Sequence, residues 1–140
     1  MGESFRRDKR VRFSHCDPAG IVFYPQYFVL FHELMEDWFN EALGEEYAPF
    51  VRGGHGLPAV KVECEFLAPN PIGDVISFEL TVAKLGASSV TMRIAGTARG
   101  VECVRATIVA VHASLHPLKS AAIPKALRAA MERFLVSFDN

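Results

Sequence analysis

Hydrophobic positions repeat along this chain with two different periods, and each period predicts a different kind of element. Between Pro25 and about Leu43 the apolar residues fall at the spacing of an amphipathic helix. Pro25 suits the first helical turn, and Gly44 suits the stop. The broad apolar face, which other elements must bury, consists of Phe28, Phe31, Leu34, Met35, Trp38, Phe39 and Ala42.

Alternation of apolar and polar residues predicts strands over residues 9–14, 59–67, 75–85, 89–99 and 102–115. The last of these is the most apolar, which favours a central position in a sheet. In the three middle strands, the residues expected to point inward are Val60, Val62, Cys64, Phe66, Ile76, Phe78, Leu80, Val82, Val90, Met92 and Ile94.

Pro124 opens a last predicted helix, whose apolar residues are Ala126, Leu127, Ala130, Met131, Phe134 and Leu135. The order is therefore strand, long helix, four strands in meander order and a terminal helix, which is an α+β layout. No repeat or linker interrupts it, so we expect a single domain over residues 1–140. A second subunit or the terminal helix would cover the remaining edges of the sheet.

Composition narrows the class of protein. Half of the 140 residues are hydrophobic and 22% are charged, which is typical of a globular chain. A net charge of −1 gives no reason to expect nucleic acid or an anionic membrane as a partner. The three cysteines are widely spaced and no apolar run reaches membrane-spanning length, so we expect a cytoplasmic protein. Neighbouring His15, Cys16 and Asp17 would point to different faces, so we expect no metal site.

The candidate reactive group is Asp17, in the tetrapeptide Asp-Pro-Ala-Gly. One interpretation is a plain turn in which the aspartate caps its own backbone. However, Gly20 permits unusual backbone shapes, and three apolar residues then follow. A carboxylate in such surroundings is costly unless it is used or satisfied.

Next to this turn the predicted helix begins, at Tyr24 and Pro25. Because proline has no N–H and the first helical amides have no intrahelical partner, we expect the amides around Tyr24 and Gln26 to be free. A carbonyl oxygen placed there would meet an N–H and the positive end of the helix dipole. A carboxylate and an oxyanion donor together are a minimal set for acyl transfer.

The stretch from Asp17 to Pro25, with Tyr27 just beyond, resembles the active-site signature of the 4-hydroxybenzoyl-CoA thioesterase family. These acyl-CoA hydrolases have the hotdog fold, an antiparallel sheet of about five strands wrapped around one long helix. The resemblance implies that Asp17 attacks the thioester carbonyl or activates water, and that the Tyr24 backbone N–H polarises that carbonyl. It also implies a homodimer or homotetramer, with an acyl-CoA as substrate and no cofactor besides the substrate's own CoA.

Further site residues follow from the same resemblance. Gly20 and the hairpin residues Lys84, Ser88 and Ser89 are the expected substrate-binding residues, with a simple polar turn as the alternative for the hairpin. His15 and His32 are possible auxiliary residues, although a packing role for His15 is the stronger interpretation. Candidates for the CoA phosphate are Arg93, Arg99 and Arg105. The glycine-rich stretch 53–56 is either a lid or, preferably, a surface connection.

We therefore expect an acyl-CoA thioesterase acting on an aryl or aliphatic acyl group. The alternative is a non-hydrolytic acyl-CoA or acyl-carrier binding protein on the same fold, since one fold hosts several functions. A binding protein has no need of a carboxylate at the helix start. Asp17 is accordingly the residue that separates the two hypotheses.

Overall fold

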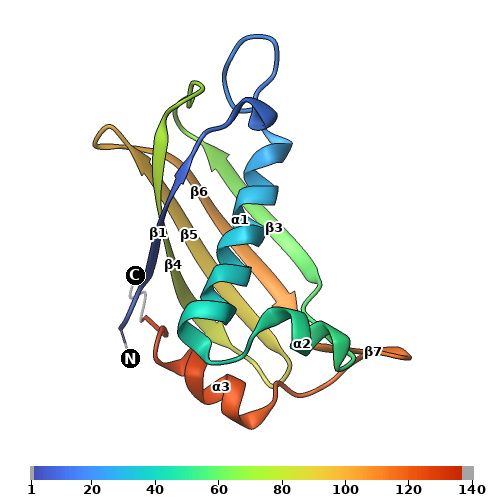
Figure 1. The fold of residues 1–140 in the computed structure, drawn as a ribbon. Coiled ribbons are helices and arrows are strands. Elements are labelled where there is room, and N and C mark those ends of the chain that lie inside the picture. The colour runs from blue at the N-terminus through green and yellow to red at the C-terminus, as the bar shows by residue number, and fades with distance from the viewer. Residues whose placement is uncertain (1, 137–140) are drawn as a thin grey trace.

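A five-stranded antiparallel sheet curves around one long helix in the computed structural model of the chain, which describes residues 2–136 (Figure 1). The strand order is β1-β4-β5-β6-β3. The strands are β1 (Phe5–Arg10), β3 (Ala59–Phe66), β4 (Val75–Leu85), β5 (Ser89–Ala98) and β6 (Val101–Val111). The expected α+β layout is confirmed, and β6 lies inside the sheet, between β5 and β3. The predicted meander order holds for β4, β5 and β6 but is wrong for β3, which pairs with β6 rather than with β4.

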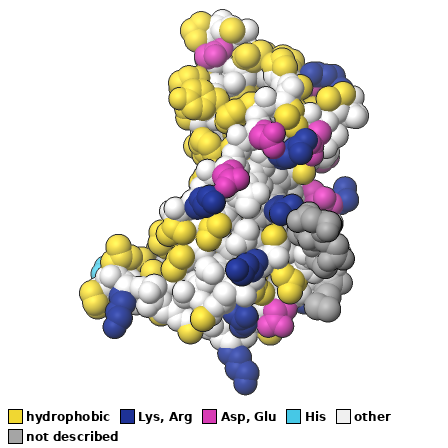
Figure 2. Space-filling view, turned by 180° about the vertical axis from the view of Figure 1, so that it is seen from behind, with side chains coloured by type: hydrophobic (Ala, Val, Ile, Leu, Met, Phe, Trp, Pro, Cys, Tyr) yellow, Lys and Arg dark blue, Asp and Glu magenta, His cyan; other side chains and the backbone are white. Residues whose placement is uncertain are grey.

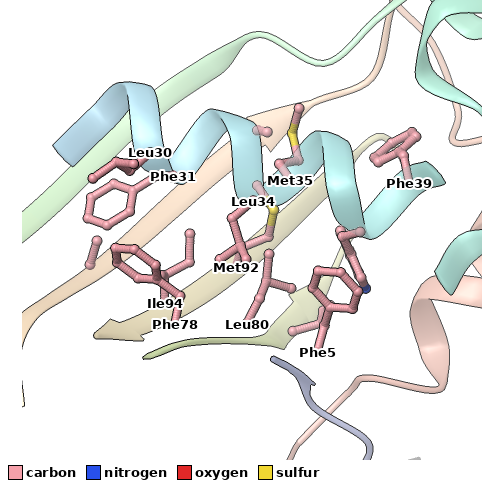
Figure 3. Packing of buried hydrophobic residues seen from close by; sticks show 14 of the residues in the cluster. Phe5, Leu30, Phe31, Leu34, Met35, Phe39, Phe78, Leu80, Met92 and Ile94 are labelled. Carbon is pink, nitrogen blue, oxygen red and sulfur yellow. The ribbon is translucent and has the colours of Figure 1, made fainter. Parts of the chain in front are cut away.

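The long helix α1 (Pro25–Trp38) continues as a π-helical segment (Phe39–Leu43) and stops at Gly44, which has a φ of 71°. Its apolar face packs on the inner face of the sheet, where α1 side chains meet residues of β4 and β5 (Figure 3). All the inward residues predicted for β4 and β5 are buried, from Ile76 to Val82 and from Val90 to Ile94. On the helix, Phe28 is 38% exposed and Ala42 is half-buried, whereas the other predicted apolar-face residues are buried.

The strand predicted over residues 9–14 lies earlier, at β1 (Phe5–Arg10), and Phe13–His15 form a 3-10 turn instead. Its alternation is mainly one of charged residues, so the apolar periodicity did not reveal it. Ion pairs take the place of apolar contacts: Arg7 pairs with Glu41 at 2.8 Å, and Lys9 pairs with Asp37.

On β3, Val62 and Phe66 face α1 as predicted, but the expected burial is wrong for most of the residues. Val60 is 62% exposed, Val62 43% and Phe66 47%. The reason is topological, because β3 is an edge strand bonded to β6 alone. A strand with exposed apolar residues and an unpaired edge invites a partner.

The segments around residues 47–56 and 112–120 also differ from expectation. Residues 47–52 form a short helix, α2 (Tyr47–Arg52), which the sequence analysis missed, and part of the glycine-rich stretch forms β2 (His55–Gly56). The strand predicted over residues 102–115 ends at Val111 and resumes as β7 (Ala113–Leu115). With β8 (Leu118–Ser120), β2 and β7 make a second, three-stranded sheet.

The predicted terminal helix is α3 (Lys125–Glu132), which buries Leu127 and Met131. Just beyond it, the Phe134 ring packs edge-on against Trp38 near the end of α1, with centroids 5.5 Å apart. The outer face of the sheet carries side chains of both charges over its middle (Figure 2). Within residues 2–136, no helix is long and apolar enough to cross a membrane.

Candidate active site

The Asp17 turn is a tight loop in which the chain doubles back. The Asp17 N–H donates to the Ile21 carbonyl at 3.1 Å, and the Gly20 N–H donates to the Asp17 carbonyl at 2.9 Å. Gly20 has a φ of 78°, a left-handed conformation that favours glycine. Its predicted role in shaping the turn is confirmed, while its predicted contact with substrate stays a prediction.

The two oxygens of the half-buried Asp17 carboxylate have different environments. Oδ1 accepts the Ala19 N–H at 2.9 Å, so the aspartate does cap its own turn. Oδ2 has no hydrogen-bond partner among residues 2–136. The capping interaction fixes the carboxylate and leaves one oxygen available for chemistry.

The start of α1 lies beside this turn. The Phe23 N–H donates to the His15 carbonyl at 2.9 Å, which closes the loop just before Tyr24. Within residues 2–136 the Tyr24 N–H has no hydrogen-bond acceptor, whereas the Gln26 N–H donates to the Phe23 carbonyl at 2.8 Å. Of the two amides expected to be free, Tyr24 keeps its donor available and Gln26 does not.

A second segment, just before β4, holds the turn in place. The Val22 N–H donates to the Asn70 carbonyl at 3.0 Å, and the Ile72 N–H donates to the Gly20 carbonyl at 2.9 Å. The Asn70 side chain is itself almost fully buried, with 1% exposed. Buried polar side chains must be hydrogen-bonded, and Asn70 is bonded on both sides.

The amide of Asn70 connects α1 to β4. Its Oδ1 accepts the Tyr27 hydroxyl at 2.6 Å, and its Nδ2 donates to Asp74 Oδ2 at 3.0 Å. Asp74 Oδ1 in turn pairs with Arg99 at 2.7 Å. Burial, together with the nearby Cys103 and other ionisable groups, raises the pKa of Tyr27 to about 12, so its hydroxyl remains a donor.

Sequence reasoning missed Asn70 as a supporting residue. The segment Pro69-Asn70-Pro71 consists of residues that are typical of a turn. The signal that was available is an asparagine between two prolines, since prolines restrict the backbone on either side of it. Nothing local indicated that its partner would be Tyr27, 43 residues away.

The two histidines proposed as auxiliary residues lie in different places. His15 Nδ1 accepts the Arg12 N–H at 2.9 Å and so stabilises the 3-10 turn; it makes no hydrogen bond to Asp17 among the described residues. His32 is exposed on α1, pairs with Glu36 at 3.2 Å and lies edge-on to Tyr47. For His15 the geometry supports the packing role.

An apolar groove of about 480 Å³ runs along α1. It lies between α1, α2 and β2 and the inner-face residues of β3, β5 and β6. Its lining includes Phe28, one helical turn after Tyr24, but neither Asp17 nor Tyr24. The Asp17 turn therefore lies near one end of the groove, outside its lining. Among the residues that line the groove, the side chains with polar atoms are His32, Tyr47 and His55.

The hairpin residues Lys84, Ser88 and Ser89 lie far from Asp17 within one chain. The turn is bonded to the segment that precedes β4, at the Ile21–Pro71 bridge. Lys84 is nine residues further along that strand than Val75, which is about 30 Å at 3.3 Å per residue. Figure 1 shows this hairpin at the opposite end of the sheet. One chain alone does not bring these residues together with Asp17.

Two of the candidate phosphate-binding arginines already have carboxylate partners. Arg99 pairs with Asp74, and Arg105 pairs with Glu102 at 2.9 Å. Burial raises the pKa of Cys64 to about 11 and also raises that of Cys103, so neither of these two thiols is activated as a nucleophile. Residues 2–136 contain no cluster of three or more potential metal ligands.

The fold of this chain, a sheet wrapped around one long helix, is shared with a known family. The family model of the thioesterase-like superfamily matches residues 11–131, so the chain belongs to this superfamily. A solved gentisyl-coenzyme A thioesterase superposes with a TM-score of 0.84 at 26% identity, covering 91% of this chain and 99% of that one. The expected hotdog fold is thereby confirmed.

Curated relatives carry related names. A 1,4-dihydroxy-2-naphthoyl-CoA hydrolase of Synechocystis sp. is 31% identical over 85 residues, which are 60% of this chain and 61% of the relative. A 4-hydroxybenzoyl-CoA thioesterase of Pseudomonas sp. is 27% identical over 95 residues, or 66% of this chain and 67% of that protein. The match thus spans about three fifths of the first relative's length.

Proposed function

We propose that the protein hydrolyses an acyl-CoA thioester to a free acid and CoA, with Asp17 as nucleophile or general base. One observation carries the proposal: a carboxylate oxygen and a helix-start N–H, both without a partner among residues 2–136, lie on one hydrogen-bonded turn. The names of the relatives support this reaction class.

In the general-base route, Asp17 Oδ2 takes a proton from water while the water oxygen bonds to the thioester carbonyl carbon. The Tyr24 N–H donates to the oxyanion that forms. The carbon–sulfur bond then breaks, and the CoA thiolate takes the proton from Asp17.

In the nucleophilic route, Oδ2 itself attacks the carbonyl carbon and CoA leaves as the thiolate. Water then hydrolyses the resulting anhydride, which restores the carboxylate and releases the acid. Both routes use the same two groups, and the geometry is compatible with either.

The apolar groove is the proposed site for the acyl group, because its first lining residue, Phe28, follows Tyr24 by one turn. The named relatives act on aryl thioesters, and an aryl group would occupy the part of the groove nearest Tyr24. A groove of 480 Å³ also exceeds what one ring needs, since a cavity of about 150 Å³ binds benzene. Aliphatic acyl groups therefore remain in the proposal.

We also propose a homodimer, alone or paired into a tetramer, formed along β3. The outer edge of β3 is unpaired among residues 2–136, and Val60, Val62 and Phe66 expose apolar surface on this strand. Phe66 is the centre of a ring cluster that reaches the start of α1, at 6.0 Å from Tyr24 and 6.5 Å from Phe28. A contiguous exposed apolar patch of this kind is typical of an interface.

Two-fold pairing of β3 with its copy would be antiparallel. It would bring the Asp17 end of one protomer towards the hairpin end of its partner. Within one chain, the Asp17 turn and the hairpin are about 30 Å apart. In the dimer, Asp17 of one protomer and the hairpin residues Lys84, Ser88 and Ser89 of the other would contact the same substrate. The described cysteines are free, which fits a reducing compartment such as the cytoplasm.

The second candidate function is a binding protein that holds an acyl-CoA without cleaving it. The observation in its favour is the bond from Ala19 N–H to Asp17 Oδ1, because a purely structural aspartate would make the same bond.

A panel of aryl, short-chain and long-chain acyl-CoAs, assayed by thiol release, separates these two functions. We expect turnover of at least one class. Tight binding of panel members without any thiol release would contradict hydrolysis and favour the binding protein. Light scattering on the same sample tests the assembly: we expect a dimer or tetramer, and Phe66→Glu should shift it towards the monomer.

A further inference from the structure

Two histidines that the proposed mechanism does not use lie at the far end of the apolar groove. His55 belongs to β2, and His112 is the buried residue between β6 and β7, with 3% exposed. His55 Nδ1 lies 3.0 Å from His112 Nε2. His112 Nδ1 lies 3.0 Å from the Ala121 carbonyl oxygen. The Phe50 ring stacks on His55, with centroids 5.0 Å apart and the planes 16° from parallel.

The Ala121 carbonyl fixes which nitrogens carry protons. A carbonyl oxygen only accepts, so His112 Nδ1 must be the donor. In the neutral ring, His112 Nε2 is then an acceptor, and His55 Nδ1–H donates a hydrogen bond to it. It follows that Nε2 of neutral His55 has a lone pair and no proton.

That lone pair is available to a ligand. His55 lines the groove, and no partner for its Nε2 exists among residues 2–136. His55 Nε2 is also accessible to solvent or a ligand. Among residues 2–136, Trp38 Nε1 is the one side-chain polar atom that is both buried and without a hydrogen-bond partner. The far end of this mainly apolar groove therefore presents a hydrogen-bond acceptor, in addition to the polar atoms of His32 and Tyr47.

The acceptor is too distant for a short acyl group. His32 lies eight residues beyond Tyr24 on α1, which is about 12 Å along the axis. From His32, a series of ring contacts leads through Tyr47 and Phe50 to His55, at 5.9, 5.9 and 5.0 Å. Figure 1 places α2 and β7, the strand that pairs with β2, at the end of α1 opposite Pro25. A group that touches both ends of the groove must be a long chain.

We propose that the groove accepts a long-chain acyl group carrying a hydroxyl at its tip, and that His55 Nε2 accepts the hydrogen bond from this hydroxyl. The proposal rests on the function proposed above and adds a preference to it. His112 acts through His55 as a positioning residue, because it holds the ring in the tautomer that accepts.

Desolvation explains why the tip of the chain would matter. A chain that fills the groove displaces water from His55 Nε2, and a methyl tip offers that nitrogen nothing in return. A hydroxyl tip replaces the lost water. A hydrogen bond that is kept rather than lost in this way corresponds to about a tenfold difference in affinity or kcat/KM.

The test is a series of straight-chain acyl-CoAs of increasing length, each made with a methyl tip and with a hydroxyl tip. For short chains we expect the methyl form to be the better substrate, or the two to be equal. At lengths that reach His55, we expect kcat/KM to favour the hydroxyl form by about tenfold. A ratio that does not change with chain length would overturn the proposal.

Variants then locate the acceptor. His55→Phe keeps a ring for the stack on Phe50 and should abolish the tip preference at the chain lengths that reach this position. His116→Gln, at an exposed histidine next to β7, is the matched control and should keep the preference. An unchanged preference in folded His55→Phe contradicts the proposal. If this variant does not fold, the length series on the wild-type protein decides alone.

Failure of the proposed function is a separate outcome. If no member of the series releases thiol, calorimetric affinities of the same pairs measure the tip preference without turnover. A preference for hydroxyl tips in binding alone would support the role of His55 and contradict hydrolysis. Equal affinities at every length would contradict the role of His55.

Discussion

The two ends of α1 are built in different ways. At its start, the Asp17 turn is held by buried polar groups, with Asn70 bonded to Tyr27 and to Asp74. At its other end, aromatic rings pack against one another: Phe50 contacts Phe39 and His55, and His55 is hydrogen-bonded to His112. Directional hydrogen bonds fix atoms where chemistry needs a defined geometry, whereas ring packing shapes a surface.

This difference implies a division of labour. Changes at the polar end should alter the rate of the chemical step, and changes at the aromatic end should alter which acyl groups are accepted. The variants below test whether the two ends can be separated in this way.

The largest expected effect on stability is at the aromatic end. Phe50 is buried and touches four other rings, so Phe50→Ala should lower the free energy of unfolding by about 3–5 kcal/mol. Urea denaturation measures this loss, with Val51→Ala, at a half-exposed neighbour, as the control. If the ends are separable, folded Phe50→Ala protein should lose chain-length preference and keep its kcat for the shortest substrate. A large loss of that kcat would break the division.

A smaller effect is expected at the polar end. Asn70→Leu nearly preserves volume but removes both side-chain bonds, which leaves the Tyr27 hydroxyl without its acceptor. We expect a loss of about 1–3 kcal/mol in unfolding free energy. Because the turn also loses its support, kcat should fall while KM changes little. Ile72→Ala, at an exposed side chain in the same segment, is the control; equal effects of both variants on kcat would contradict a positioning role for Asn70.

The smallest effect concerns alkaline stability. The pKa of Tyr27 is raised from 10.0 to about 12 in the folded protein, so the unfolded chain loses this proton first as the pH rises. The resulting contribution to stability is complete below pH 10 and disappears as the pH passes through about 12. Tyr27→Phe should therefore flatten the decline in stability over this window. An unchanged slope, measured by urea denaturation at several pH values, would show that Tyr27 does not cause it.

How far the sequence predicted the molecule depends on how local each signal is. The apolar periods gave α1, β4 and β5 with nearly all of their buried residues, because those elements face one core. Asp17 and the free Tyr24 amide were predictable since one continuous segment contains both. Gln26 was not, because the turn bond to the Phe23 carbonyl depends on the observed backbone conformation.

The features that were missed arise from distant segments. Asn70 meets Tyr27 across 43 residues, and His55 meets His112 across 57. The exposure of Val60 and Val62 follows from the edge position of β3, which depends on strand order rather than on alternation. The separation of Lys84 from Asp17 follows from the same topology.

The claim that the Asp17 side chain performs the chemistry is tested most directly by Asp17→Asn. The variant keeps an oxygen that can accept the Ala19 N–H and removes the basic carboxylate. On the best substrate of the panel, kcat should fall by about 10²–10⁴, the usual contribution of such a group. Affinity for a non-cleavable thioether analogue should stay within about threefold, a small change on the free-energy scale of binding. The control Asp8→Asn, at an exposed carboxylate on β1, should keep the wild-type kcat. Wild-type turnover by Asp17→Asn would contradict the account.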